Sequence, residues 1–308
     1  MVPVRPIFDR IVFESGLARI GAFRCDPAHP CFRDTGPAEN YCFVFPRTAV
    51  EIQHEHEPAF VANPNVVTFY NAGQSYTRNA ISPEGDHCDW FGVEARLVRD
   101  AIRAFDPHVD DREQPFLLTR GWSSSATYLL QRNLFTQAGS RDMVDVLAVE
   151  ETVVDLLDQV IRSAYAPFSP SVSAAVCSRQ RATVHDIETI LSVHPAEPAS
   201  LRSIADQVGL SAYYVCRVFR QVTGRKLHQY RSCLRLRVAL MEVLESARSL
   251  TDIALDAGFS SHSHFTSSFH REFGATPSWL RTARPSTSSF SNFLIAPPAR
   301  LGILVAES

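Results

Sequence analysis

Short runs rich in β-branched and aromatic residues occupy the chain between residues 40 and 94, and this pattern predicts strands. β-Branched and aromatic residues concentrate in four segments that proline and glycine separate. The predicted strands are Tyr41–Phe45, Thr48–Gln53, Val66–Tyr70 and Asp89–Val93. Because no helical segment lies between them, the spacing favours a sandwich or a small barrel over a parallel sheet.

From Glu94 onwards the hydrophobic period becomes that of helices, which are predicted at Ala95–Phe105, Ser123–Gln137 and Asp142–Ser163. In the third helix, apolar residues recur at alternating spacings of three and four: Val146, Val149, Val153, Leu156 and Val160. Further apolar residues make this face broad, and two interpretations stay open. The helix belongs to the core of the β domain, or part of it also packs against a second subunit. The latter predicts a homodimer through helix 142–163.

The second half of the chain contains a duplicated pattern. Leu201-x-x-Ile204-Ala205-x-x-x-Gly209 recurs 49 residues later as Leu250-x-x-Ile253-Ala254-x-x-x-Gly258. Downstream, Val215-x-x-x-Phe219 with Gly224 recurs 50 residues later as Phe265-x-x-x-Phe269 with Gly274. The duplication therefore covers two successive elements and the turn between them.

This spacing has a direct physical meaning. Leucine, isoleucine and alanine at i, i+3 and i+4 line one helix face, and glycine at i+8 ends the helix in a left-handed turn. Serines are predicted to cap the helices: Ser200 and Ser249 (with Asp252 completing a capping box) before the first helix of each copy, and Ser211 and either Ser261 or Ser263 before the second. The pattern predicts two helix-turn-helix units.

A connecting helix is predicted at Lys226–Ser246, where Leu227, Tyr230, Leu234, Val238 and Met241 follow a spacing of three to four. A helix of about 20 residues spans ~30 Å. Major-groove segments on one side of a DNA duplex recur every ~34 Å. The connector is therefore long enough to present two helices to adjacent groove segments, which makes double-stranded DNA the leading partner.

Composition supports a globular protein of two domains, with 308 residues, 45% of them hydrophobic and 20% charged. Residues 181–284 hold thirteen basic and nine acidic residues, a net charge of +4, whereas residues 1–180 have a net charge of −7. Only the second part is expected to meet a polyanion. No uninterrupted apolar run of ~18 residues and no secretory signal is seen, so a cytoplasmic protein without a membrane segment is expected. The seven cysteines include no C-x-x-C pair and are expected to be free thiols.

Residues Glu197–Arg281 resemble the DNA-binding domain of the AraC/XylS family of bacterial transcription regulators, most specifically in the stretch Ile253–Arg281. The first half resembles the family's cupin-like sensor domains, chiefly in Asn63–Tyr76. The resemblance implies an effector-responsive regulator that binds promoter DNA as a dimer, with no enzymatic activity and no cofactor. RNA polymerase is a further partner if the protein activates transcription. Two departures are Leu227, where the family usually has proline, and Ser267, at a position often held by arginine.

The predicted architecture is an α+β chain of two domains. A cupin-like β-barrel or sandwich with helices, for effector sensing and dimerisation, covers residues 1–164, and a proline- and serine-rich linker covers 165–180. An all-α DNA-binding domain, with two helix-turn-helix units joined by a long helix, covers 181–284. The tail 285–308 is assigned no function.

The DNA-binding candidates are the side chains left outside the apolar faces of the reading helices. Val215, Val218 and Phe219 are expected in the core of one unit, and Phe265 and Phe269 in the other. The remaining candidates are Ala212, Tyr213, Cys216, Arg217, Arg220, His262, His264, Thr266, Ser267 and His270. Arg217 is the foremost candidate for a guanine or phosphate contact. Arg231 and Arg235, one turn apart on the connector, have either phosphate or acidic side chains of the protein as their partners.

The predicted effector pocket of the β domain draws on aromatic residues that are equally compatible with an ordinary core: Phe43, Phe45, Phe69, Tyr70, Tyr76 and Trp90. An alternative function, a metal-dependent cupin enzyme fused to a DNA-binding module, rests on three histidines. Alternate strand residues point to one face, so His54 and His56 could both point inward, and with His87 they could make a three-nitrogen site. A polar strand face without a metal is the simpler interpretation. Cys88, beside His87, offers a thiol for sensing oxidants.

Overall fold

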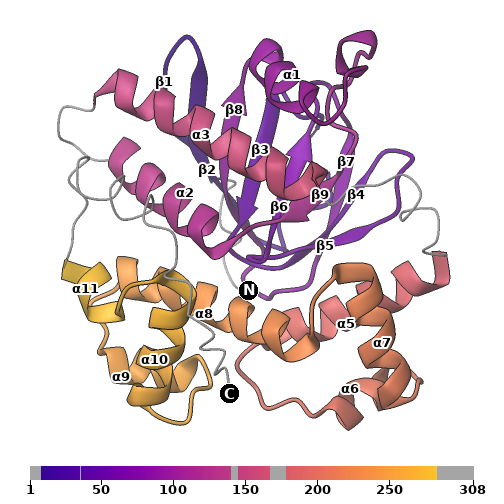
Figure 1. Ribbon diagram of the computed structural model, residues 1–308, viewed down its shortest axis with the longest axis vertical. Helices are drawn as coiled ribbons and strands as arrows, with labels where there is room; N and C mark the ends of the chain where they lie inside the picture. The colour runs from indigo at the N-terminus through magenta and orange to yellow at the C-terminus, as the bar shows by residue number, and fades with distance from the viewer. Residues whose placement is uncertain (1–7, 35, 140–144, 167–177, 283–308) are drawn as a thin grey trace, which may run out of the picture.

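The computed structural model describes residues 8–34, 36–139, 145–166 and 178–282 (Figure 1). Residues 8–166 form a part built on strands, here the β half, and residues 178–282 a part built on helices, here the helical half. The described helices include none that is long and apolar enough to cross a membrane.

The β half contains two antiparallel sheets. The larger sheet has the strand order β1 (Phe8–Glu14), β2 (Ala18–Cys25), β8 (Asp86–Val93), β3 (Tyr41–Pro46), β6 (Val66–Tyr70), β9 (Arg120–Trp122). The smaller sheet has the order β5 (Phe60–Ala62), β4 (Val50–His54), β7 (Tyr76–Ala80). All four predicted strands are present, with β8 beginning three residues earlier than expected.

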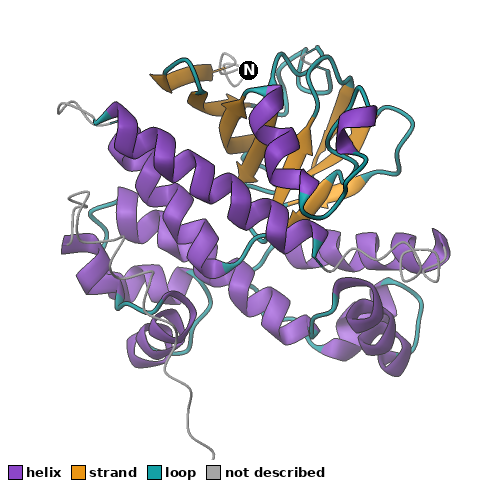
Figure 2. Cartoon of the chain, turned by 45° about the horizontal axis from the view of Figure 1, so that its top comes forward, coloured by secondary structure: helices purple, strands orange, loops and turns teal. Residues whose placement is uncertain are grey.

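After β8, the described residues of the β half form α1 (Ala95–Arg103), a short 3-10 turn η1 (Val109–Asp111), strand β9, and then α2 (Ser125–Ala138) and α3 (Val146–Tyr165). Helices α2 and α3 run across the larger sheet (Figures 1 and 2). Between sheet and helices lies a core that includes the rings of Phe43, Phe45 and Phe69, each at most 1% exposed. One face of the larger sheet is therefore covered by the helices.

Helix α3 confirms the predicted seam and limits its breadth. Val149, Val153, Leu156 and Val160 are buried in the core. Asp145 caps the helix by accepting from the Ala148 amide, so the helix begins at Val146, and residues 142–144 lie outside the described part. Val146, the first residue of the predicted seam, is 50% exposed and therefore not part of the buried face. Leu147 and Val154 are 64% and 37% exposed, so three apolar side chains of this helix face solvent.

The helical half consists of α5 (Ser178–Val193), α6 (Leu201–Gln207), α7 (Ala212–Thr223), α8 (Leu227–Glu245), α9 (Leu250–Asp256), α10 (His262–Phe273) and α11 (Pro277–Thr282). Helices α6 and α7 are called the first pair, and α9 and α10 the second pair. The predicted caps Ser200, Ser211 and Ser249 each accept a hydrogen bond from the backbone amide three residues on, as does Ser261, the first of the two alternatives for the second pair. The connector α8 matches its predicted bounds to within one residue.

The two pairs lie at opposite ends of α8, which passes beneath the β half (Figure 1). The first pair packs with α5 in a small apolar cluster of its own. The second pair belongs to the same apolar core as the larger sheet and α3, and α10 contacts α2. Of the predicted linker, Tyr165 and Ser178–Gln180 are helical, and residues 167–177 lie outside the described part, as does the tail 285–308.

The connector α8 is joined to the β half by buried polar contacts. The Tyr230 hydroxyl accepts from the Asn63 side-chain amide at 2.8 Å, and its carbonyl accepts from that of Asn65 at 2.9 Å. Arg237, which is fully buried, donates to the carbonyls of Pro64 and Ser123, each at 2.6 Å. Because buried donors and acceptors are costly to leave unpaired, these bonds fix the position of the helix on the β half.

Candidate functional site

The outer face of α7 is cationic. Val215, Val218 and Phe219 are buried, as predicted, and this orientation leaves a shallow groove lined by Tyr213, Cys216, Arg217, Arg220 and Gln221. Tyr213 is 75% exposed, which is unusual for a large aromatic side chain. Arginine and tyrosine donors that face solvent from one helix form a surface suited to phosphates and base edges.

The outer face of α10 is polar but carries fewer charges. Phe265 and Phe269 are buried, as predicted, and the candidates His262, His264, Ser267 and His270 are exposed, with Thr266 half-buried. The His264 ring packs against Phe259 with centroids 5.4 Å apart, and its Nδ1 lies 3.2 Å from the Ser260 hydroxyl. The two helices therefore present the same backbone element with different chemistry.

Among the described residues, the connector arginines do not contact the acidic side chains that are one of their two predicted partners. Arg231 donates to the backbone carbonyls of Pro195 and Glu197, and Arg235 donates to the carbonyl of Ala257 at 2.6 Å. The partners that the structure gives them are thus backbone carbonyls, rather than acidic side chains. Burial lowers the pKa of both guanidinium groups from their ordinary value. Arg231 thus holds the turn that leads into α6, and Arg235 holds the turn between α9 and α10.

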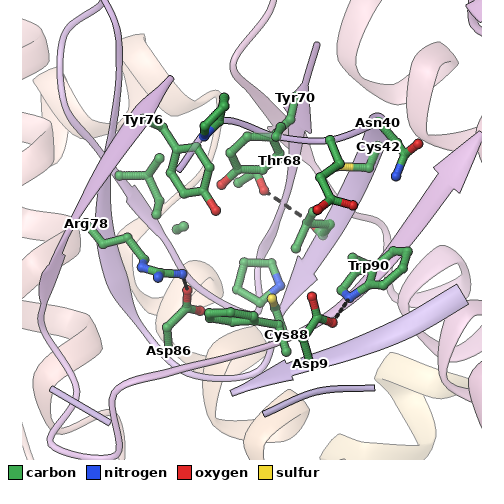
Figure 3. A pocket seen from close by; sticks show the side chains of 18 of the residues that line it. Asp9, Asn40, Cys42, Thr68, Tyr70, Tyr76, Arg78, Asp86, Cys88 and Trp90 are labelled. Atoms are coloured by element: carbon green, nitrogen blue, oxygen red, sulfur yellow. Dashed lines mark hydrogen bonds and ion pairs between the residues drawn. The ribbon is translucent and has the colours of Figure 1, made fainter. Parts of the chain in front are cut away.

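A cavity of about 310 Å³, here the inter-sheet cavity, lies between the two sheets (Figure 3). Strands β3, β6 and β8 of one sheet and β4, β5 and β7 of the other line it. Of the predicted pocket residues, Tyr70, Tyr76 and Trp90 line the cavity. Phe43, Phe45 and Phe69 do not, because alternate strand residues face opposite sides and these three face the helices.

Several charged and polar groups that line the cavity contact one another. Arg78 contacts Asp86 at 2.7 Å and donates to the Phe32 carbonyl at 2.8 Å, and its guanidinium lies over the Phe23 ring. At the opposite wall the Trp90 indole donates to Asp9 at 3.0 Å. The walls thus combine aromatic rings with a fixed polar framework, which is the common composition of a small-molecule site.

Two thiols, those of Cys42 and Cys88, also line this cavity. Burial raises the pKa of Cys42 to about 12 and the pKa of Cys88 well above its ordinary value. Because the thiolate is the reactive form, both side chains are held in their unreactive form at neutral pH. The structure therefore does not support the expectation that Cys88 senses oxidants.

The three histidines of the alternative function do not converge. His54 is the last residue of β4 and is 1% exposed, whereas His56 lies in the following turn with φ 64° and a side chain that is 90% exposed. The prediction that both point to one face is wrong, because the strand ends between them. His87 lies half-buried on β8. Within the described ranges, no group of three or more His, Cys, Asp or Glu side chains is arranged to hold a metal ion.

The buried network at the junction of the halves was not predicted. It includes Arg47, Asp89, Arg132 and Glu245, which are far apart in the sequence and follow no local spacing. The one available signal was charge at inward positions, such as Asp89 within an apolar strand.

Comparison with known proteins shows which family the helical half resembles. Residues 204–283 match the family described as a helix-turn-helix domain. The chain is 34% identical over 98 residues to the regulatory protein SoxS of Escherichia coli strain K12, covering 32% of this chain and 92% of SoxS. It is 34% identical over 123 residues to the transcriptional regulator Rob of Salmonella typhimurium, covering 40% of this chain and 41% of Rob. It therefore spans only about two fifths of the length of Rob.

Among solved structures, an AraC-type transcriptional regulator from Chromobacterium violaceum is 29% identical, with a TM-score of 0.33, and covers 36% of this chain and 98% of that one. The helix-turn-helix match and the similarity to nearly the whole of SoxS both fall on the helical half, and they identify its helix pairs as those of a helix-turn-helix domain. The chain belongs to the AraC/XylS family.

Proposed function

We propose that this chain is an effector-controlled transcription regulator whose two helix-turn-helix units, α6–α7 and α9–α10, read two adjacent major-groove segments of promoter DNA. The observation that carries the proposal is the placement of α7 and α10, each the second helix of its pair, at the two ends of α8 (Figure 1). The 19 residues of α8 span ~28 Å. This length approaches the ~34 Å that separates groove segments on one side of the duplex.

In this proposal the exposed residues of α7 supply most of the affinity. Arg217 contacts a guanine edge or a phosphate, Arg220 a phosphate, and Tyr213 a thymine methyl group or a phosphate. Cys216 and Ala212 lie against the base edges. On α10, the contacts come from short or neutral side chains, which are His262, His264, Thr266, Ser267 and His270. Arg231 and Arg235 act indirectly, by holding the turn before the first pair and the turn within the second pair.

The effector is proposed to bind in the inter-sheet cavity, among Tyr70, Tyr76 and Trp90. A ligand that binds one arrangement of the protein more tightly than another shifts their populations, and thereby operator occupancy or contact with RNA polymerase.

The exposed Leu147 and Val154 support a homodimer through α3, because apolar side chains on one outer helix face favour a partner surface. Such a regulator acts in the cytoplasm, where its DNA lies.

Selection of duplexes from a random pool by the full chain tests the DNA-binding part. Footprinting of the enriched duplexes is expected to give two protected major-groove segments on one side, with centres about 10–10.5 base pairs apart. Protection of a single segment, or failure to enrich any duplex, would remove the proposal.

Thermal-shift measurements of the full chain against a panel of metabolites test the effector part. A ligand that raises the melting temperature is expected to lose its effect in Tyr76→Ala, which alters the cavity, and to keep it in Tyr213→Ala, which alters only α7. Equal shifts in both variants would place the ligand elsewhere.

For the dimer, Leu147→Glu is expected to give a monomer in sedimentation velocity, and an unchanged mass would contradict the interface.

A further inference from the structure

Two arginines and two carboxylates form a closed ring of ion pairs, here the charge ring, where the end of α8 meets the β half. Arg47 contacts Asp89 at 2.8 Å and Glu245 at 3.1 Å. Arg132 contacts the same two carboxylates. Every charge in the ring therefore has two partners of opposite sign.

The ring is anchored in the interior and reaches the surface at one point. The side chains of Asp89 and Arg132 are 0% and 2% exposed, whereas that of Glu245 is 46% exposed. The Phe135 ring lies beside both arginines, with its centroid 5.2 Å from the Arg47 guanidinium and 5.3 Å from that of Arg132. Buried ion pairs contribute little net stability but demand one geometry, because removing a partner leaves a charge uncompensated.

The ring touches the strands that line the inter-sheet cavity. Asp89 lies on β8 between Cys88 and Trp90, both of which line the cavity, and Arg47 directly follows Pro46, which also lines it. Because successive residues of a strand point to opposite faces, the cavity and the ring occupy the two sides of the same strands. A displacement of β8 by a ligand therefore moves Asp89 as well.

The charge ring also fixes the C-terminal end of α8, which leads into the second pair. Glu245 is the last residue of α8, and α9 begins five residues later at Leu250. The first pair is held independently at the opposite end of α8, through Tyr230, whose ring contacts Phe219 of α7 at 5.3 Å. The angle between α7 and α10 thus depends on how the end of α8 is held.

We propose that the charge ring is a positioning device that sets the second DNA-reading helix relative to the first and couples this setting to strand β8 of the cavity. Glu245, Arg47, Arg132 and Asp89 are positioning residues, since none of them lies on an outer reading face. The inference rests on the proposed function, because it assumes that both helices contact DNA.

The test uses a duplex that the wild-type full chain selects from a random pool, and versions in which its two contacted segments are moved by one or two base pairs. The variant is Glu245→Gln, which removes the one half-exposed charge of the ring. The matched control is Glu242→Gln, which removes a carboxylate one turn earlier that contacts only the exposed Arg248, at 3.7 Å, among the described residues.

Wild-type protein and Glu242→Gln are expected to bind the original spacing about five- to tenfold more tightly than the shifted ones. Glu245→Gln is expected to flatten this preference to about twofold, with unchanged melting of the β half. A spacing profile of Glu245→Gln equal to that of wild type would overturn the inference while leaving the proposed function intact. Failure of wild type to enrich any duplex would instead remove the proposed function.

A second arm tests the coupling to the cavity. Cys88→Leu, which places a larger side chain in the cavity, is expected to change the spacing profile when Glu245 is present and to leave it unchanged in the Glu245→Gln background. Trp90→Phe, which removes the indole hydrogen bond to Asp9, is the milder variant if Cys88→Leu does not fold. Equal effects of these substitutions in both backgrounds would overturn the coupling.

Discussion

The two helix pairs have nearly the same backbone and very different surroundings. In both, a serine caps the second helix and a glycine with positive φ separates the helices, Gly209 at 66° and Gly258 at 75°. The first pair packs with α5 in a separate cluster, whereas the second pair is continuous with the core of the β half. A duplicated sequence pattern thus fixes the local fold of a unit but not what the unit is attached to.

The outer faces of the two pairs also differ: the pair that is less attached to the β half carries more charged side chains. The first pair, which is the less integrated, carries Arg217, Arg220 and Tyr213, while the equivalent positions of the second pair hold Ser267, His270 and Ser263. We interpret the first pair as the source of binding energy and the second as the pair whose placement is regulated. Substitutions at equivalent positions separate these roles.

The largest expected effects come from the central phenylalanines of the two pairs. Phe219→Ala and Phe269→Ala each remove a fully buried ring, which costs about 3–5 kcal/mol of unfolding free energy. Because Phe219 lies in the separate cluster, which includes Tyr230 of α8, its loss is expected to raise hydrogen exchange only in α5–α7 and the first turns of α8. The loss of Phe269 is expected to raise exchange in α2 as well. The same exchange pattern for both variants would contradict the difference in attachment.

The turn glycines are expected to differ in a second way. Both have positive φ, so alanine costs about 1–2 kcal/mol at either position. At Gly209 an added Cβ has nothing within 4 Å, whereas at Gly258 it would overlap the carbonyl oxygen of Ala196. Gly258→Ala is therefore expected to cost about 3–4 kcal/mol in all, as measured by urea unfolding. Equal costs would show that the second pair can move away from the 194–197 loop.

Much of this organisation could be predicted from the sequence because it is local. The periodicity of α8, the serine caps and the glycine turns all depend on residues within a few positions of each other, and α8 was placed to within one residue. The strand pattern likewise gave β6 exactly as found. Local hydrogen bonding and the helical period determine such elements without reference to the rest of the chain.

What could not be predicted depends on long-range packing. Alternation along β3 put Phe43 and Phe45 on one face but did not say which face the helices cover, and they cover the aromatic one. The sequence pattern also did not show that strand β4 ends at His54 and that a turn exposes His56. The charge ring joins residues 47, 89, 132 and 245, whose proximity no local spacing encodes.

The difference in surface charge predicts unequal contributions to DNA affinity. Arg217→Ala is expected to weaken binding to a duplex selected by wild type by about 1–3 kcal/mol, in a fluorescence anisotropy titration at fixed salt. Ser267→Ala, at the equivalent position, is expected to change affinity by less than about 0.5 kcal/mol. If Ser267→Ala weakened DNA binding as much as Arg217→Ala, the two pairs would contribute equally to affinity, and the distinction between a pair that supplies binding energy and a pair whose placement is regulated would be lost.

The smallest expected effect is one that the two pairs should share. The Ser211 hydroxyl accepts from the Tyr214 amide at 3.2 Å, and the Ser261 hydroxyl accepts from the His264 amide at 3.1 Å. Ser211→Ala and Ser261→Ala are each expected to lower the unfolding free energy by about 1 kcal/mol, since each leaves one helix-terminal amide without its partner. Ser263→Ala, on the exposed first turn of α10, is the control and is expected to have no effect on urea unfolding. A cost at Ser263 rather than Ser261 would mean that the duplicated pattern does not extend to the start of the second reading helix.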